Sequence, residues 1–235
     1  MNDKYVLALG FFDGIHLGHT ALLRRTAERA KELGAQSAVI TFDVHPDTLV
    51  RDCRVPLINH DADRVALIRS MSGIENVYFL PFTRETMETP WRDFLTALEA
   101  KRPAAGYVVG HDFRFGHRGE GDGEKLRRYG EENGLRVDVI DAVCVDGHIA
   151  SSTYIRELLE RGDIAAANRV LGHPHYLSGV GTDAFLPWQP ELQRLPNGRY
   201  SVRVNGAAAE LSADERGLHG EALCGQVEIE FYGAH

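Results

Sequence analysis

Near its start the chain reads Gly10-Phe11-Phe12-Asp13-Gly14-Ile15-His16-Leu17-Gly18-His19, and this stretch lies between two contrasting apolar patterns. Before it, Tyr5-Val6-Leu7-Ala8-Leu9 has the length and composition of a buried strand. After it, apolar residues from Leu23 to Leu33 recur at helical spacing. Asp13-Gly14 predicts a tight turn, because glycine adopts backbone angles that other residues resist. The sequence therefore predicts a strand, a glycine turn and a helix N-terminus in direct succession.

A helix start of this kind is suited to binding an anion, because the N–H groups of its first turn have no partners within the helix. Gly18 removes a side chain beside these groups. His16 and His19 add two imidazoles three residues apart, and an imidazole can donate to a phosphate oxygen near neutral pH. The same pair could instead be surface residues or bind a metal ion. The preceding strand and turn favour phosphate chemistry, although neither the P-loop pattern nor G-x-G-x-x-G occurs at this turn.

The composition is that of an ordinary globular chain. Of its 235 residues, 43% are hydrophobic and 26% charged, and this length accommodates one α/β domain with a small appendage. The net charge of −8 argues against a general nucleic-acid binder, which would carry a basic stripe. Three cysteines (Cys53, Cys144 and Cys224) form no Cys-x-x-Cys pair, so we expect neither a zinc site nor a disulfide framework. We expect no signal peptide and no membrane-spanning run, and we predict a cytoplasmic protein with no membrane partner.

Strand-like and helix-like segments alternate through the first 140 residues. The predicted strands are 5–9, 36–41, 76–80, 106–109 and 136–140, and the predicted helices include 64–71 and one that begins at Pro90. Alternation of this kind predicts an α/β fold with a parallel sheet between two layers of helices. Because ligands of such sheets bind beyond the carboxyl ends of the strands, the loops at those ends are candidates for the site.

Two of these loops have an unusual composition. Phe42-Asp43-Val44-His45-Pro46 could be an ordinary strand end, or Phe42 could offer a flat apolar face to a ring. Gly110-His111-Asp112-Phe113-Arg114-Phe115-Gly116 puts two phenylalanines in a glycine-bounded loop, where an exposed Phe is unfavourable. Within this loop Arg114 could stack on a ring or bind a phosphate, and Asp112 could orient a ligand or cap the loop.

A third stretch, Ser151-Ser152-Thr153-Tyr154-Ile155-Arg156, precedes a predicted helix. Ser or Thr at this place is an ordinary N-cap. Hydroxyl and N–H groups at a helix start also suit phosphate oxygens, and Arg156, about one turn further on, could reach the same anion.

These stretches together resemble the bacterial FAD synthetase family, whose H-x-G-H nucleotidylyltransferase domain adenylylates FMN. Members have similar Thr-Phe-x-x-His-Pro, Gly-x-Asp-Phe-x-Phe-Gly and Ser-Ser-Thr-x-Ile-Arg strings, in the order found here. The resemblance implies a Rossmann-like domain over residues 1–178. It also implies the reaction of ATP with FMN to give FAD and pyrophosphate, with Mg²⁺ arriving on ATP and no metal held by the protein alone.

The resemblance further implies a role for individual residues. The catalytic residues would be His16, His19 and Arg156. The ATP phosphates would contact Gly10, Phe11, Phe12, Asp13, Gly14, Gly18, Ser151, Ser152 and Thr153. The flavin would contact Phe42, His45, Pro46, Asp112, Phe113 and Arg114.

After residue 178 the resemblance becomes weaker. Bifunctional members continue into a riboflavin kinase barrel with a Gly-Phe-Pro-Thr-Ala-Asn string, which this sequence does not contain. Alternation of apolar and polar residues at 200–204 and 227–231 predicts a small β unit. We predict that residues 179–235 form a degenerate or reduced kinase-like β domain, which serves as packing or as an interface for self-association and does not phosphorylate riboflavin.

The sequence leaves two other functions open. Another H-x-G-H transferase would use the same phosphate machinery with a different phosphorylated acceptor, and only the loops at Phe42 and Asp112 favour a flavin. A non-catalytic flavin- or nucleotide-binding protein is the second alternative, and the intact His16, His19 and Arg156 argue against it.

Overall fold

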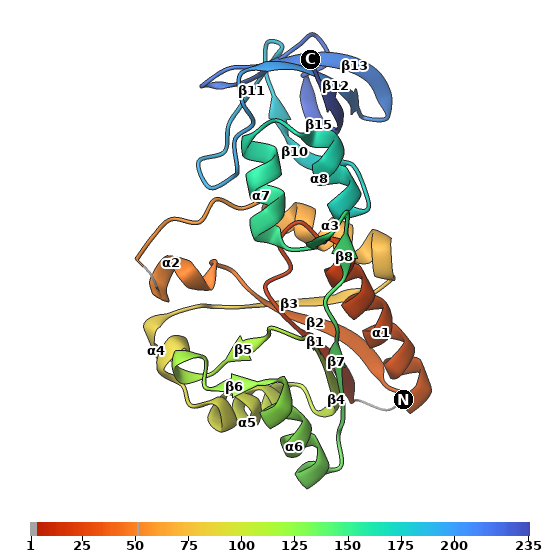
Figure 1. Cartoon of the computed structure of the whole chain (residues 1–235), viewed down its shortest axis with the longest axis vertical. Helices are drawn as coiled ribbons and strands as arrows, with labels where there is room; N and C mark the ends of the chain where they lie inside the picture. The colour runs from red at the N-terminus through yellow and green to blue at the C-terminus, as the bar shows by residue number, and fades with distance from the viewer. Residues whose placement is uncertain (1–3, 51) are drawn as a thin grey trace. The chain divides into compact units, whose positions relative to one another are not determined.

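A five-stranded parallel sheet forms the centre of the first of two compact units in the computed structural model (Figure 1). The structure describes residues 4–50 and 52–235. Among these, the first unit comprises 4–12, 18–50, 52–55 and 65–142, and the second comprises Asp13–Leu17, Pro56–Arg64 and Val143–His235.

The sheet of the first unit has the strand order β3-β2-β1-β4-β7, and all four neighbouring pairs are parallel. Its strands are β1 (Tyr5–Leu9), β2 (Gln36–Phe42), β3 (Asn76–Leu80), β4 (Ala104–Gly110) and β7 (Arg136–Ile140). The chain runs outward from β1 to β3 and then returns to the other side of β1 at β4. The order therefore reverses between β1 and β4, which is where sheets of this type bind ligands. The α/β fold predicted from the sequence is confirmed.

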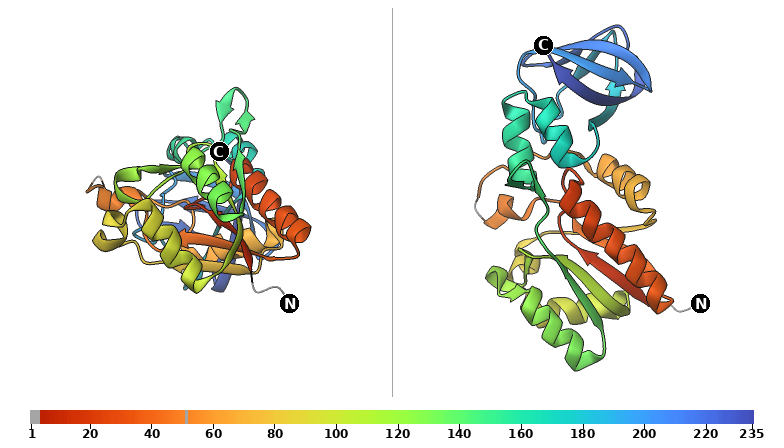
Figure 2. Two further views of the ribbon diagram at one scale, coloured as in Figure 1. Left: turned by 90° about the horizontal axis from the view of Figure 1, so that it is seen from below. Right: turned by 45° about the vertical axis from the view of Figure 1, so that its right-hand side comes forward.

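Helices cover both faces of this sheet, with α1 (Leu17–Leu33) on one side and α5 (Trp91–Lys101) and α6 (Gly123–Asn133) on the other (Figure 2). On the side of α5 and α6, buried residues of β1, β2 and β4 pack against Leu95 of α5 and Leu126 of α6. On the other side, α1 buries Leu22, Leu23 and Ala30. The remaining helix of ordinary length, α3 (Asp61–Ser72), matches the predicted 64–71 and is three residues longer at its start.

Several short elements of this unit were not predicted, because each is too brief to show a periodic pattern. They are α2 (Pro46–Val50), α4 (Arg84–Glu88), β5 (Arg114–Phe115), the 3-10 turn η1 (His117–Gly119) and β6 (Gly121–Asp122). The segment 110–123, which includes the predicted glycine-bounded loop at 110–116, thus contains a small antiparallel hairpin of β5 and β6.

The second unit is built on a six-stranded antiparallel sheet with the order β10-β15-β12-β13-β14-β11. Its strands are β10 (His175–Gly181), β11 (Phe185–Pro187), β12 (Gly198–Val204), β13 (Ala207–Ala213), β14 (Gly217–His219) and β15 (Gly225–Ala234). Before them come the hairpin β8 (Cys144–Val145) and β9 (His148–Ile149), and the helices α7 (Ser152–Glu160) and α8 (Ile164–Leu171). The predicted small β unit is therefore present.

One continuous core joins the helices and the sheet of the second unit. It contains Leu158 of α7, Val170 of α8, Tyr200 of β12 and Phe231 of β15. Residue 178, the predicted limit between an adenylyltransferase module and a kinase-like module, lies within β10. That limit concerns the extent of two modules and stays a prediction.

Candidate functional site

The turn after β1 has a strained backbone. Phe12 and Ile15 have φ angles of 57° and 40°, in the left-handed region that side chains disfavour, and both are fully buried. Gly14 between them has a φ of 81°, and a Cβ on it would lie 2.8 Å from Cδ1 of Ile58. Strain of this kind persists only where the surrounding packing imposes it, and it is concentrated at functional sites.

Asp13 is the centre of a buried polar cluster in the second unit. Its carboxylate accepts hydrogen bonds from the backbone N–H groups of Ile58, at 2.9 Å, and Asn59, at 3.1 Å. Nη1 of Arg156 donates to Oδ2 of Asp13 at 3.1 Å. Burial raises the pKa of Asp13, while the charge of Arg156 and the two amides favour the ionised form. Asp13 was predicted to contact phosphate, but its oxygens are turned to these three donors.

The start of α7 brings further predicted residues to the same cluster. Ser151 is the N-cap, with its Oγ accepting from N–H of Tyr154 at 3.2 Å. The Ser152 hydroxyl donates to the carbonyl oxygen of Asp13 at 2.8 Å, while Thr153 is exposed. Arg156 keeps 14% of its side chain exposed. The structure therefore brings together Asp13, Ser152 and Arg156, all of which were predicted to belong to the site. Asp13 lies near the start of the chain, and the other two lie about 140 residues further along.

His16 and His19 do not share a regular helical face, because α1 begins at Leu17. His16 directly precedes the helix and is 7% exposed, and His19 lies in its first turn. Burial lowers the pKa of His16 to about 4, so its imidazole is neutral at pH 7 and carries a single N–H. The ring of His19 lies 5.1 Å from the ring of Phe12, centroid to centroid.

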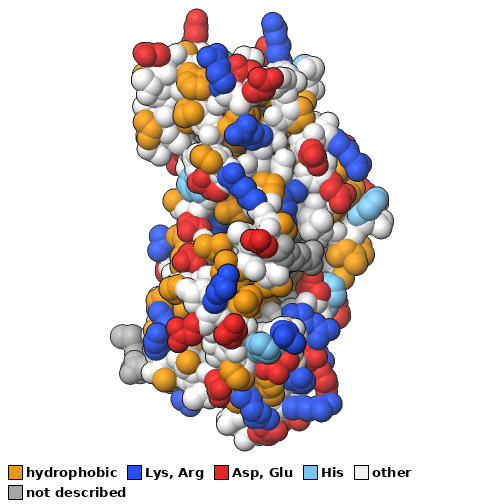
Figure 3. All heavy atoms as spheres, turned by 90° about the vertical axis from the view of Figure 1, so that its left-hand side faces the viewer, with side chains coloured by type: hydrophobic (Ala, Val, Ile, Leu, Met, Phe, Trp, Pro, Cys, Tyr) orange, Lys and Arg blue, Asp and Glu red, His pale blue; other side chains and the backbone are white. Residues whose placement is uncertain are grey.

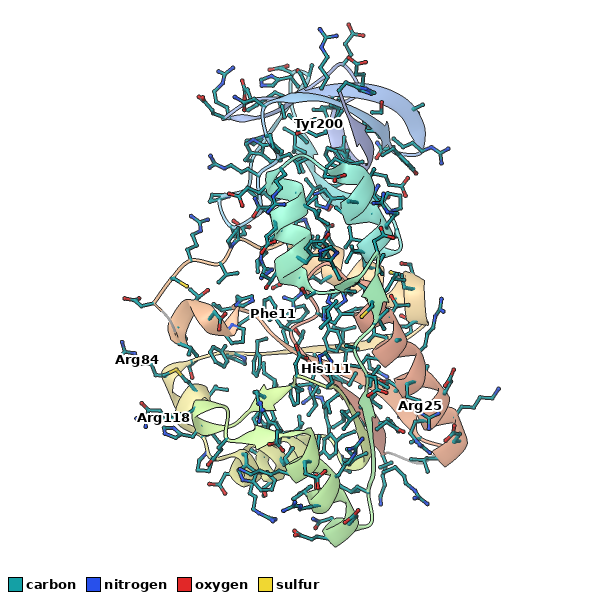
Figure 4. The ribbon with its side chains drawn as sticks, viewed as in Figure 1. Phe11, Arg25, Arg84, His111, Arg118 and Tyr200 are labelled. Atoms are coloured by element: carbon teal, nitrogen blue, oxygen red, sulfur yellow. The ribbon has the colours of Figure 1, made fainter. Side chains whose placement is uncertain are left out.

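The predicted flavin residues near β2 contact neighbouring aromatic rings in the first unit. The Phe11 ring, labelled in Figure 4, lies edge-on to the ring of His45 with 4.6 Å between centroids. Phe42 lies edge-on to Phe82 at 4.9 Å. Nδ1 of His45 accepts from N–H of Asp47, in the first turn of α2, which Pro46 begins. Gly10 packs against a different ring, because a Cβ on it would lie 3.0 Å from the Phe12 ring.

The loop at 110–123 is held together mainly by packing. Phe113 stacks on Phe115 with centroids 5.3 Å apart, and Phe115 also meets Trp91 edge-on. Gly116 has a φ of 74°, and a Cβ on it would lie 2.5 Å from the Trp91 side chain. Arg114 forms an ion pair with Asp122 at 3.0 Å. The aromatic residues of this loop therefore have a structural explanation that does not depend on a ligand.

Asp112 and Gly18 are the last predicted residues. The Asp112 side chain is 83% exposed, and its Oδ1 lies 3.9 Å from Nδ1 of His111. It is therefore accessible beyond the end of β4. Gly18 is the second residue of α1, as expected for a bare helix start.

The sequence interpretation missed His173, Ile58 and Asn59. His173 was given no role, yet its Nε2 lies 3.2 Å from the carbonyl oxygen of Gly14, and burial lowers its pKa. Ile58 and Asn59 bind Asp13 through their backbone amides, and a backbone contact cannot be recognised from the identity of the residue. Only the downstream Pro174, which constrains the chain beside His173, could have drawn attention to that histidine.

Acidic and basic side chains are intermixed on the face that Figure 3 shows. Among residues 4–50 and 52–235, no group of three or more His, Cys, Asp or Glu side chains could hold a metal ion. In the part of the chain that the structure describes, no helix has both the length and the apolar character needed to cross a membrane.

Comparison with known proteins identifies relatives over most of the chain. The FAD synthetase family matches residues 1–154. A protein of Geobacillus thermodenitrificans named putative bifunctional riboflavin kinase/FMN adenylyltransferase is 36% identical over 171 residues, which are 72% of this chain and 90% of that protein. The bifunctional riboflavin kinase/FMN adenylyltransferase of Listeria monocytogenes is 32% identical over 180 residues, or 74% of this chain and 56% of that protein.

The matched region spans only about half the length of several curated relatives, including the Listeria protein. A crystal structure from Streptococcus pneumoniae, described as a macrolide-efflux protein, superposes with a TM-score of 0.87. It covers 100% of this chain and 95% of that one at 22% identity, and it therefore supports the fold alone. From the family match and the 36% identical relative, we conclude that this chain belongs to the FAD synthetase family.

Proposed function

We propose that this protein transfers the adenylyl group of ATP to FMN, giving FAD and pyrophosphate. The observation that carries the proposal is the buried ion pair between Asp13 and Arg156. It joins the first and the last of the four stretches that resemble the family, which are 143 residues apart. A guanidinium held in this way has further N–H donors and is suited to binding a phosphate. The names of the relatives, which include FMN adenylyltransferase, support the choice of reaction.

In the proposed reaction a phosphate oxygen of FMN attacks the α-phosphorus of ATP. A new P–O bond forms, the bond between the α-phosphorus and the bridging oxygen breaks, and pyrophosphate leaves with the electron pair. Catalysis of this kind relies on positioning and on stabilising the charge that develops on phosphate oxygens. His16 and His19 would donate to these oxygens, helped by the N-terminus of α1. Arg156 and the N–H groups at the start of α7 would hold the β/γ end of ATP.

The flavin would lie against Phe42, His45 and Pro46, with Asp112 as a polar contact. This part of the proposal rests on the family resemblance and on the exposure of Asp112. Phe113 and Arg114 would contribute less than the resemblance suggests, because the ring of Phe113 stacks within the unit and Arg114 is paired with Asp122.

Magnesium would enter as the MgATP substrate. The Asp13 carboxylate is occupied by two amides and a guanidinium, which makes it a poor metal ligand. Since magnesium bound to a nucleotide usually retains water and phosphate ligands, few protein oxygens are needed.

The β unit at 179–235 would not phosphorylate riboflavin. A kinase needs a phosphate-cradling loop and hydroxyls that orient a metal. The hydroxyl side chains of this unit include Thr182, Ser201 and Ser212, which are scattered over different strands and loops. Its carboxylates Glu228 and Glu230 alternate with buried residues along β15, as side chains on an outer face do.

The test is to incubate the protein with MgATP and either FMN or riboflavin, and to identify products by mass. We expect FAD and pyrophosphate from FMN, and no FMN from riboflavin. Failure to form FAD would remove the proposed transferase. FMN formed from riboflavin at a rate comparable to FAD formation would instead show that the β unit has kinase activity.

A further inference from the structure

Strand β10 of the antiparallel sheet is bound to the segment 57–64, which we call the connecting segment. The hydroxyl of Ser178 donates to Oδ1 of Asp63 at 2.6 Å, and its N–H donates to Oδ2 at 3.0 Å. Nδ2 of Asn59 donates to the carbonyl oxygen of Tyr176 at 2.7 Å. Asp63 is only 2% exposed, so these bonds are shielded from water. The connecting segment is thus fixed to β10 at two points.

The same connecting segment binds Asp13 from its other side. The amides of Ile58 and Asn59 donate to the Asp13 carboxylate, and that carboxylate accepts from Arg156. Asn59 therefore uses its side chain for β10 and its backbone for Asp13. A series of contacts therefore leads from β10 to Arg156. Ser178 is hydrogen-bonded to Asp63, and the backbone of the connecting segment joins Asp63 to Asn59. Asn59 is hydrogen-bonded to Asp13, which binds Arg156. Every member of this series belongs to the second unit.

Stability alone does not explain two buried carboxylates in this series. Burying a charge costs free energy, and well-packed apolar residues are often as stabilising as a buried ion pair. What hydrogen bonds to a carboxylate add is a fixed geometry. Asp13 binds one nitrogen of the Arg156 guanidinium, and this side chain is 14% exposed. Fixing the carboxylate therefore fixes the position of the guanidinium nitrogen that it binds, and with it the orientation of the planar group.

We infer that Ser178 and Asp63 are positioning residues for adenylyl transfer, which hold Arg156 on the ATP phosphates through the connecting segment and Asp13. This inference rests on the proposed function. It assigns a task to the β unit that does not need kinase chemistry: β10 supports the arginine that binds the nucleotide.

The first experiment compares Ser178→Ala with Tyr200→Phe. Each change removes one hydroxyl from a strand of the same sheet, and Tyr200 donates to the carbonyl oxygen of Pro196, outside the series (Figure 4). We expect Ser178→Ala to raise the KM for ATP by about tenfold, since small misplacements of a binding group are costly. The KM for FMN should stay within about twofold, and Tyr200→Phe should match the parent in both. Equal KM values for ATP in all three proteins would overturn the inference.

A double-mutant cycle separates positioning from general destabilisation. If Ser178 acts through Arg156, Ser178→Ala should have little further effect on the KM for ATP once Arg156→Lys is present. If the two changes instead multiply in their effects on the KM for ATP, Ser178 acts by another route. That result would reject this inference and leave the proposed transferase activity unaffected.

Amide hydrogen exchange provides a readout that does not depend on catalysis. In Ser178→Ala we expect the amides of Ile58 and Asn59 to exchange at least about tenfold faster, with amides of β12 unchanged. If the parent forms no FAD, this measurement and the titration of ATP binding to both proteins still decide the inference. Unchanged exchange and unchanged ATP binding would reject it.

Discussion

The turn at 10–19 and the loop at 110–123 follow two neighbouring strands, β1 and β4, and both contain glycine, phenylalanine and aspartate. Their interiors differ. The buried side chains of the turn include a carboxylate, that of Asp13, which accepts from two amides and an arginine. In the loop, the buried group is the ring of Phe115, and Asp112 is exposed. Similar composition thus has two causes, the placing of charge in one region and the packing of rings in the other.

The largest expected effect is a loss of stability on substitution in the loop, and it would confirm that the loop serves for packing. Phe115→Ala should lower the free energy of unfolding by about 3–5 kcal/mol, because it removes a ring that meets Trp91 and Phe113. Urea titration measures this change. The folded fraction should bind ATP as the parent does. If stability is preserved and ATP binding is lost, the loop has the catalytic role that we assign to the turn.

At the turn, the expected effect is on rate and not on stability. His16→Ala or His19→Ala should reduce kcat for FAD formation by about 10²–10³, or about 2.7–4 kcal/mol, as removal of one donor to a developing oxyanion does. His111→Ala is a matched control at the end of β4, where the side chain is 42% exposed (Figure 4). Parent-like turnover in both turn variants would exclude the proposed mechanism.

A conservative change tests the geometry of the charge at the turn. Arg156→Lys keeps the charge and loses the planar fork, so we expect the KM for ATP to rise by roughly 10–100-fold, or about 1.4–2.7 kcal/mol. Arg169→Lys is the control, because that arginine pairs with Asp146 on the surface of the same unit. Overlapping ATP titrations for Arg156→Lys and the parent would leave Arg156 with its structural pairing to Asp13 and no role in binding ATP.

The last expected effect concerns acid stability. Burial lowers the pKa of His16 to about 4 and that of His175 in β10 to about 3, whereas both are near 6.5 in the unfolded chain. Between these values the unfolded state binds protons that the folded state excludes. The free energy of unfolding is therefore highest above pH 6.5. It decreases as the pH falls below 6.5, by up to about 1.4 kcal/mol per pH unit for each histidine.

Urea midpoints between pH 7 and pH 5 measure this slope. His175→Phe should reduce it, because the ring against Phe231 remains and the titrating group is gone. An unchanged slope in this variant would mean that His175 gains a proton without cost in the folded protein.

Sequence reasoning succeeded where local patterns are long. Strands β1 and β3 were predicted to the residue, because their apolar runs end at clear breaks. It did not find β13, whose Ala207–Ala213 stretch is rich in alanine and has no strand-like pattern. That segment is a strand because β12 and β14 pair with it on either side, and this tertiary context outweighs local propensity.

The sequence allowed us to predict which residues belong to the candidate site. It did not allow us to predict which of them contact one another. Asp13 was expected to contact phosphate, yet its partners Ile58 and Arg156 lie 45 and 143 residues further along the chain. No local pattern can show that a backbone amide so distant will donate to a given carboxylate. Arg156 was identified through its neighbours Ser151 and Ser152, and the structure adds the partner that orients it.

The spacing between Asp13 and Arg156 also has a consequence during synthesis. A ribosome adds about 5–20 residues per second, so the 143 residues between the two take about 7–29 s to appear. Throughout that interval the nascent chain carries the carboxylate without the cation that it later binds. Completion of the cluster is therefore a late event, and a chain stalled before residue 156 would present Asp13 to chaperones and solvent as an unpaired charge.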